Sequence, residues 1–210
     1  MLTISYGMPG SGKGLHAIMA MEQALMRRRK VVTNIKLSKA CPWRKYVGFL
    51  SNRDVWDGKE GFWSRVPNEH FIVIDEADNF FDADWGRMAS DKFGSDDPDV
   101  VTPRTYFKQH RHYFHDLLLV TQCIDNLWIR IKRVATQHLY CEWSFRTTPL
   151  HRDIPIGWTK FHYITHVGVQ LKPDAVISQG FQRYSVMQRY FDYYESDQII
   201  GAGGGIRCLT

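Results

Sequence analysis

A glycine-rich segment near the start of the chain carries the residue types and spacing that bind phosphate groups. Residues 7–14 read GMPGSGKG, which satisfies the pattern G-x-x-x-x-G-K. Glycines let the backbone curl so that successive N–H groups point at phosphate oxygens, and the lysine ammonium reaches the β and γ phosphates of a nucleotide. The segment predicts an ATP site whose binding residues are Gly7, Pro9, Gly10, Ser11, Gly12, Lys13 and Gly14.

The elements on either side of this loop are the ones that such a loop requires. Leu2–Tyr6 is a short run typical of a buried strand, and apolar residues recur near helical spacing over residues 13–29. A helix that begins at the lysine adds the positive end of its dipole to the site. The alternative is a glycine turn that binds nothing, but the flanking strand and helix favour nucleotide binding.

Gly14 departs from the usual pattern, which places serine or threonine after the lysine. That hydroxyl normally gives one oxygen ligand to Mg²⁺, an ion that requires an octahedral shell of oxygens. A water molecule can fill the gap, with weaker metal binding and slower turnover as the expected result. Whether ATP is hydrolysed is therefore open on the sequence alone.

An acidic pair follows a second buried run. Residues 71–74 (FIVI) are continuously apolar, and Asp75 and Glu76 come directly after them. In a parallel sheet this end of a strand lies beside the nucleotide crevice. Asp75 is therefore predicted to hold Mg²⁺, and Glu76 to orient or deprotonate the attacking water. The alternative is that the pair only begins a loop or caps a helix.

A third apolar run, residues 117–121, is followed by Gln122. A polar side chain at such a strand end can sense the γ phosphate or position water, as glutamine does in other nucleotide hydrolases. The alternative is a strand-end residue that simply faces solvent. We include Gln122, with Lys13 and Glu76, among the predicted catalytic residues.

Cationic side chains are concentrated between residues 104 and 152. Such a surface suits DNA, acidic lipid or the nucleotide of a neighbouring subunit. An arginine donated in trans would neutralise charge that grows on the transferred phosphoryl group. The candidates for this role are Arg104, Arg111, Arg130 and Arg133.

Two further clusters have simpler interpretations. The basic residues 27–30 (RRRK) end the first predicted helix, where they indicate either a solvated helix terminus or a contact with phosphate or a membrane surface. His110, His112 and His115 are spaced so that they do not share one helix face, so we do not predict a metal site from them.

The order of the elements predicts the fold class. Strand-like runs alternate with helical segments, and residues 138–145 and 160–169 alternate in the manner of a final antiparallel pair. We therefore predict an α/β fold of the P-loop NTPase type, with a mainly parallel sheet flanked by helices and an antiparallel strand pair near the C-terminus.

Length and composition favour one packed domain. The chain has 210 residues, of which 44% are hydrophobic and 23% charged, and its formal net charge is +5. These values exclude a disordered chain and a disulfide-stapled miniprotein. We predict a P-loop ATPase domain over residues 1–200 and a glycine-rich tail over residues 201–210.

The four cysteines are scattered singly, without the paired spacing of a zinc site or a disulfide framework. A reducing cytoplasm is therefore expected. The N-terminus opens directly into a strand-like run, and no apolar run approaches the roughly 18 residues of a membrane span. These features predict a soluble, unexported chain.

With both motifs placed, the chain resembles the cytoplasmic N-terminal domain of the zonular occludens toxin (Zot) family, which includes the gene I assembly proteins of filamentous phages. The resemblance covers nearly the whole chain in the expected order. Beyond the loop it rests on residues 33–36 (TNIK), 72–76 (IVIDE), 110–112 (HRH), 116–122 (DLLLVTQ) and 192–196 (DYYES). Besides Gly14, the chain departs from the family at Phe114, where a glycine turn is usual, and at residues 80–82, which replace a Trp-Pro-like segment.

The resemblance implies an additional-strand P-loop ATPase that forms homo-oligomers and energises extrusion of phage particles through the host inner membrane. It implies phage coat or assembly proteins as partners, and it makes Arg111, which lies in the family's basic segment, the first choice for the trans arginine. Family members continue into a transmembrane helix, so a full-length form is expected at the cytoplasmic face of the inner membrane of the bacterial host. The toxin activity belongs to that further part and is not expected of this chain.

Two alternative functions stay open on the sequence. The basic region between residues 104 and 152 indicates a DNA-translocating packaging ATPase. Gly14 indicates a nucleotide-dependent binding module with weak hydrolysis.

Overall fold

The computed structural model describes residues 1–57, 60–84, 101–145, 159–166, 176–183 and 190–194. The glycine-rich tail expected over residues 201–210 lies outside these ranges. No helix in the described part of the chain is both long and apolar enough to cross a lipid bilayer.

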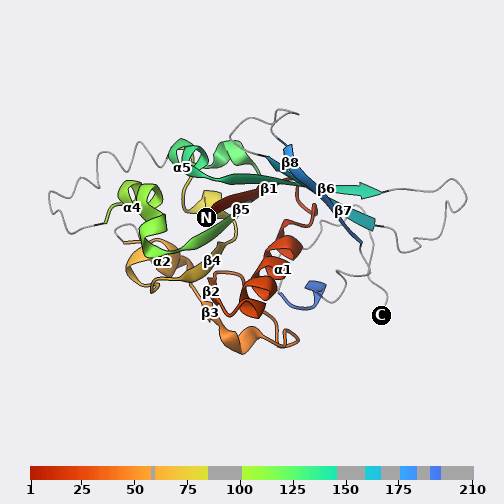
Figure 1. The fold of residues 1–210 in the computed structure, drawn as a ribbon, viewed down its shortest axis with the longest axis horizontal. Coiled ribbons are helices and arrows are strands. Elements are labelled where there is room, and N and C mark those ends of the chain that lie inside the picture. The colour runs from red at the N-terminus through yellow and green to blue at the C-terminus, as the bar shows by residue number, and fades with distance from the viewer. Residues whose placement is uncertain (58–59, 85–100, 146–158, 167–175, 184–189, 195–210) are drawn as a thin grey trace, which may run out of the picture.

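One twisted sheet of eight strands runs through the molecule (Figure 1). The first six strands in its order are mutually parallel, whereas β7 is antiparallel to both β6 and β8. Across the sheet the strands are β3 (Val47–Phe49), β2 (Lys30–Thr33), β4 (His70–Ile74), β5 (Asp116–Thr121), β1 (Leu2–Tyr6), β6 (Gln137–Phe145), β7 (Thr159–His166) and β8 (Val176–Arg183). The long parallel part is the α/β architecture that the alternation of elements predicts.

Helices cover both faces of the parallel part (Figure 1). On one face lies α1 (Lys13–Met26), and on the other pack α2 (Asn52–Val55), α4 (Pro103–Gln109) and α5 (Ile129–Val134). Single turns of 3₁₀ helix connect these elements: η1 (Arg44–Tyr46), η2 (Phe62–Ser64), η3 (Ala77–Asn79), η4 (His110–Tyr113) and η5 (Ile124–Asn126).

Successive side chains of a strand point to opposite faces of the sheet, so the interior is divided into two cores. In β4, Ile72 and Ile74 pack into the core under α4 and α5, whereas Val73 packs into the core under α1. The first core is rich in aromatic rings, and Trp63 stacks on Tyr106 with 4.9 Å between ring centroids. Because both faces are covered, the central strands β4 and β5 are almost entirely apolar, as their sequences predict.

The basic cluster after α1 differs from the expected helix end. The helix stops at Met26, and Arg28 adopts a left-handed conformation with φ of 60°. Arg29 turns back to the sheet, where its Nη1 lies 2.8 Å from Asp116 Oδ2 and its Nη2 donates to the Phe114 carbonyl at 3.3 Å. Arg29 therefore has a structural partner at the start of β5.

Phe114 accounts for one departure from the family pattern. It ends η4 with φ of 53° and leaves its ring 67% exposed. Glycine adopts this left-handed conformation without steric penalty, whereas an L-residue is strained there by about 1 kcal/mol. Phe114 thus adopts a conformation that glycine would adopt more easily.

Two of the three neighbouring histidines are buried structural groups. His110 Nδ1 donates to the Phe107 carbonyl at 2.9 Å. His115 Nε2 donates to the Pro67 carbonyl at 3.0 Å, which leaves Nδ1 to accept from the Tyr106 hydroxyl at 2.9 Å. Burial lowers the pKa of both imidazoles. The fold therefore holds them neutral.

His16 of α1 is also held neutral, and burial lowers its pKa further, to about 4. A histidine whose pKa is depressed by folding stabilises the native state fully above the unfolded pKa of about 6.5, and this stability is lost as the pH falls toward the native value. We expect the free energy of unfolding to decrease between pH 6.5 and 4, with at most about 3 kcal/mol from His16. Urea denaturation at stepped pH measures this loss.

The matched variants for that experiment are His16→Gln and His112→Gln. His112 is exposed on η4, so its replacement should leave the slope of stability against pH unchanged. His16→Gln should flatten the slope, and an equal slope in both variants would contradict the assignment to His16.

Candidate functional site

The loop of residues 7–12 joins β1 to α1, and its shape depends on glycine. Gly7, Gly10 and Gly12 have φ angles of 150°, 78° and 87°. A Cβ on Gly7 would lie 2.2 Å from the Cys141 carbonyl oxygen of β6, so no larger residue fits there. The neighbouring strand and the positive φ angles together account for this spacing of glycines.

The loop has the features of an anion site. Helix α1 begins at Lys13 without a side-chain cap and without an acidic residue in its first turn, so its amino end presents uncapped N–H groups and positive charge. Ser11 is 3% exposed, and its Oγ has no hydrogen-bond partner among the described residues. A Cβ on Gly10 would meet no atom within 4 Å, so the loop is open on that side. These features fit a phosphate group.

The ammonium of Lys13 lies across the loop. Its Nζ donates to the carbonyls of Gly7 at 2.7 Å and Met8 at 2.9 Å. Burial lowers the Lys13 pKa, and the charges of Cys141 and Asp75 oppose that shift. A partly buried cation held only by carbonyl dipoles is ready to pair with an anion that enters the loop.

Asp75 follows β4 and is fixed by its backbone. Its N–H donates to Asn34 Oδ1 at 2.7 Å, and Asn34 Nδ2 donates to the Asp75 carbonyl at 3.0 Å. Burial raises the pKa of its carboxyl, and Lys13 lowers it. Lys13 and Asp75 thus influence each other, as a phosphate-binding cation and a metal-binding carboxylate at one site should.

Glu76 has a different environment from its neighbour. It adopts a left-handed conformation with φ of 48°, and its exposed carboxylate accepts from Asn79 Nδ2 at 2.9 Å. The turn at Glu76 therefore separates the two carboxylates, with Asp75 largely covered and Glu76 in contact with water. That division suits a metal ligand beside a residue that orients water.

Asn34 is a positioning residue that sequence reasoning missed. Residues 33–36 stood out only as part of a family pattern, without a role for the amide. Its two hydrogen bonds join the end of β2 to the end of β4, which are neighbours in the sheet but far apart in sequence. Only the order of the strands could have indicated this pair.

Gln122 lies at the same edge of the sheet as the loop. The register pairs Tyr6, the last residue of β1, with Thr121, the last of β5. Thr121 Oγ1 donates to the Cys123 carbonyl at 3.1 Å, and the Gln122 side chain is exposed. The fold therefore brings Lys13, Asp75, Glu76 and Gln122 to one edge, while the role of each stays a prediction.

Arg111 lies elsewhere. It is exposed on η4, which precedes β5, and the adjacent Tyr113 carbonyl accepts from the Glu69 N–H before β4 at 3.0 Å. In a parallel sheet, residues that precede the strands lie at the edge opposite to those that follow them. Within one chain Arg111 does not reach the loop, so a role in trans stays a prediction. The other candidates, Arg104, Arg130 and Arg133, are also exposed.

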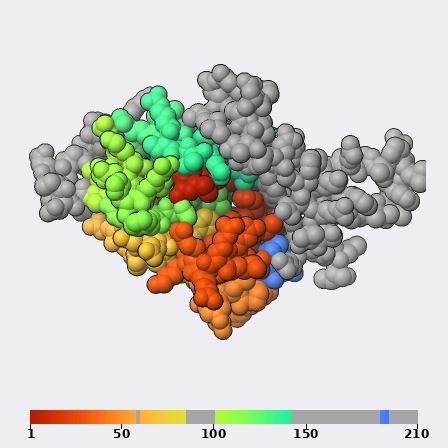
Figure 2. All heavy atoms as spheres, viewed as in Figure 1, coloured from red at the N-terminus to blue at the C-terminus, as the bar shows by residue number. Residues whose placement is uncertain are grey.

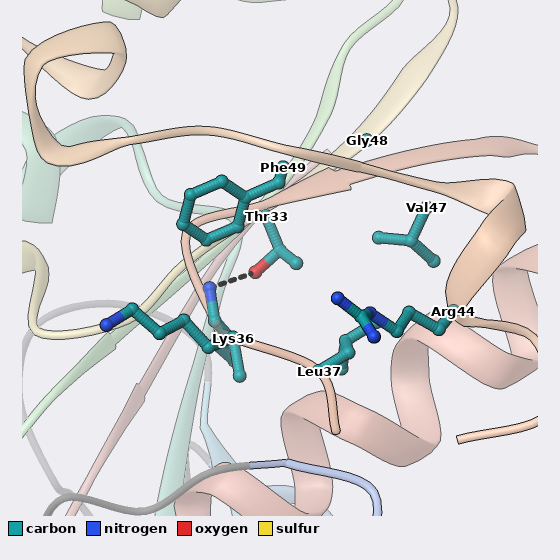
Figure 3. Close-up of a pocket in the computed structure, with 8 residues that line it drawn as sticks. Thr33, Lys36, Leu37, Arg44, Val47, Gly48 and Phe49 are labelled. Carbon is teal, nitrogen blue, oxygen red and sulfur yellow. Dashed lines mark hydrogen bonds between the residues drawn. The ribbon is translucent and has the colours of Figure 1, made fainter. Parts of the chain in front are cut away.

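A separate pocket of about 420 Å³ lies between the end of β2 and edge strand β3 (Figure 3). Its cations are Lys36 and Arg44, and the Thr33 hydroxyl accepts from the Ile35 N–H at 3.1 Å beside it. None of its lining residues belongs to the glycine-rich loop, so it is not the phosphate site.

The described residues contain no cluster of three or more His, Cys, Asp or Glu side chains that could cage a metal ion. Mg²⁺ does not need one, since it is usually held by one or two carboxylates together with substrate phosphates and water. Asp75, next to an open phosphate loop, fits that mode of binding.

Comparison with known proteins gives a consistent result. A family model described as zonular occludens toxin (Zot) matches residues 1–198. The putative assembly protein ORF301 of Pseudomonas phage Pf3 is 28% identical over 145 residues, which cover 67% of this chain and 42% of that protein. The chain thus spans less than half the length of that relative.

Two solved structures share the fold. The N-terminal domain of zonular occludens toxin from Neisseria meningitidis has a TM-score of 0.53 at 18% identity, covering 92% of this chain and 98% of that one. The genome packaging NTPase B204 of Sulfolobus turreted icosahedral virus 2, in complex with ATP-gammaS, has a TM-score of 0.50 at 12% identity, covering 86% and 96%. The predicted P-loop NTPase fold is confirmed.

Proposed function

Because this chain belongs to the zonular occludens toxin (Zot) family, we propose that it is an ATPase domain that powers filamentous phage assembly and export at the host inner membrane. The observation that carries the ATPase part is the cradle of residues 7–13, with the buried, unpartnered Ser11 hydroxyl and the Lys13 ammonium beside Asp75. An open helix terminus, a cation and a covered carboxylate are the groups that phosphoryl transfer uses.

The residues have distinct tasks in this proposal. The loop N–H groups and Lys13 bind the phosphates, and Asp75 holds Mg²⁺, which when bound neutralises charge on the phosphoryl group. Glu76 orients the attacking water with its exposed carboxylate, and Gln122 positions or senses the terminal phosphate. Arg111 of one subunit acts on the nucleotide of the next, in a homo-oligomer.

The phage part of the proposal is supported by the relatives. A protein described as a putative assembly protein matches two thirds of the chain. Phage coat or assembly proteins are the proposed partners, and the cytoplasmic face of the bacterial inner membrane is the proposed location.

A second candidate is a DNA-translocating packaging ATPase. It is supported by exposed cations on α4, η4 and α5, namely Arg104, Lys108, Arg111, Arg130 and Arg133. Cationic surfaces bind the DNA backbone most strongly at low salt. A third candidate, a binding module with weak hydrolysis, is supported by the absence of a hydroxyl at Gly14.

Phosphate release from ATP by the purified chain distinguishes these functions. We expect Mg²⁺-dependent release that phospholipid vesicles or coat protein increase. Activation by DNA instead, lost at high salt, would favour the packaging function. If ATP binds but no phosphate is released under any of these conditions, the chain is a nucleotide-binding module and the ATPase proposal is wrong.

A further inference from the structure

Tyr194 lies against the position where this chain lacks the usual hydroxyl. A Cβ on Gly14 would lie 3.3 Å from the Tyr194 hydroxyl oxygen and 3.5 Å from two atoms of its ring. A serine at position 14 would carry its oxygen one bond beyond that Cβ, so a hydroxyl pointing toward Tyr194 would collide with it. The two hydroxyls therefore compete for the same space.

Several contacts hold residues 190–194 in this place. The Tyr190 hydroxyl donates to Glu22 of α1, and the Ser38 N–H donates to the Tyr193 carbonyl at 2.9 Å. Leu37 forms an antiparallel bridge with Tyr194 itself. In Figure 2 the blue segment of these residues is seated against the orange surface of α1. These contacts hold the backbone at Tyr194, and its side chain packs against the core under α1.

The Tyr194 side chain lies near two residues of the predicted nucleotide site, Gly14 and Asp75. Asp75, the predicted metal ligand, is close enough for its charge to add to burial in raising the Tyr194 pKa. The phenol consequently stays protonated at neutral pH. Among the described residues no hydrogen bond uses this hydroxyl, so it is available to a ligand.

We propose that Tyr194 supplies, from the C-terminal segment, the hydroxyl that Gly14 lacks, and that it contacts the Mg²⁺–phosphate group of the bound nucleotide. This inference rests on the proposed nucleotide binding. Glycine at position 14 then makes room for the tyrosine, since a Cβ there would lie in tight contact with the Tyr194 hydroxyl. A purely structural role would need only the ring, which phenylalanine also provides.

The hydroxyl is tested by calorimetry with the slowly hydrolysed analogue ATP-gammaS, in Mg²⁺ and in EDTA. The quantity compared is the factor by which Mg²⁺ increases affinity. Tyr194→Phe keeps the ring and should reduce this factor by about ten- to a hundredfold, the usual effect of losing a hydrogen bond to a charged group. Tyr193→Phe is the matched control, because its ring packs on Trp43 with 6.1 Å between ring centroids and its hydroxyl forms no hydrogen bond among the described residues.

A second variant moves the hydroxyl back to position 14. Gly14→Ser combined with Tyr194→Ala removes the colliding ring and should restore the Mg²⁺ factor, whereas Gly14→Ser alone should lower it. Thermal unfolding of each variant reports whether the segment still packs. Restoration by the double variant would exclude a merely structural role for Tyr194.

The outcomes separate the two proposals. If the unaltered chain binds no ATP-gammaS, the proposed function is wrong and this inference falls with it. If the unaltered chain binds with a Mg²⁺ enhancement that Tyr194→Phe retains in full, only the inference about Tyr194 is overturned.

Discussion

Replacing Lys13 with alanine is expected to lower ATP affinity at least about a hundredfold while leaving the fold intact. The ammonium would form charge-assisted hydrogen bonds with two phosphates, and losing these removes about 3 kcal/mol or more of binding free energy. Among the residues that the structure describes, Lys13 donates only to the carbonyls of Gly7 and Met8. The Met8 bond is exposed and the Gly7 bond only partly buried, so water can replace the ammonium there. Calorimetric titration with ATP measures the loss.

Lys39→Ala is the control for this variant. Lys39 is an exposed lysine outside the loop, so its replacement should leave the affinity unchanged. Thermal unfolding of both variants should match that of the unaltered chain. Normal ATP affinity in Lys13→Ala would mean that residues 7–14 are a glycine turn and not a nucleotide site.

Replacing Glu76 with glutamine is expected to lower the rate of ATP hydrolysis about a hundredfold or more, with ATP affinity unchanged. The amide keeps the shape of the side chain and can still accept from Asn79, but it cannot deprotonate or orient water as a carboxylate does. The left-handed backbone at Glu76 is the same for both residues, so the turn is preserved. Steady-state phosphate release gives the rate.

Asp78→Asn is the matched control for Glu76→Gln. Asp78 lies in the same turn, and its charge also acts on Lys13 and Asp75. A general electrostatic effect would therefore slow both variants alike. A Glu76→Gln enzyme as fast as the unaltered chain would remove Glu76 from the mechanism, and equal losses in the two variants would assign the effect to charge.

Much of the fold could be predicted from the sequence because its central strands are buried on both faces. The apolar runs at residues 71–74 and 117–121 predicted β4 and β5 to within one residue, and the short run Leu2–Tyr6 before the glycine-rich loop predicted β1. The helix after the loop was extended three residues too far, because Arg27, Arg28 and Arg29 suit a helix end as well as a turn. The region between β2 and β4 has no regular apolar period, since its short helical turns are shaped by packing around Trp63 and Tyr106.

The residues of the candidate site also fall into two groups, those that the sequence predicted and those that only the fold revealed. The residues of the loop and the acidic pair could be predicted because each group is defined by neighbours in the chain: glycines that turn, a lysine that begins a helix, carboxylates that end a strand. Asn34 and Tyr194 gave no such signal. Each acts on a residue distant in sequence, Asp75 for one and Gly14 for the other, and their contacts exist only once the sheet and the C-terminal segment are in place.

The sequence alone thus determined the position of the predicted phosphate loop between a strand and a helix, because backbone curvature, helix start and charge are local properties of residues 7–14. Tertiary structure alone decided which side chains share that site. Parallel strand order brings Asp75 and Gln122 to the loop and sends Arg111 to the opposite edge. The same folding seats Tyr194 over Gly14, because contacts across the sheet and helix layers depend on packing that no local pattern encodes.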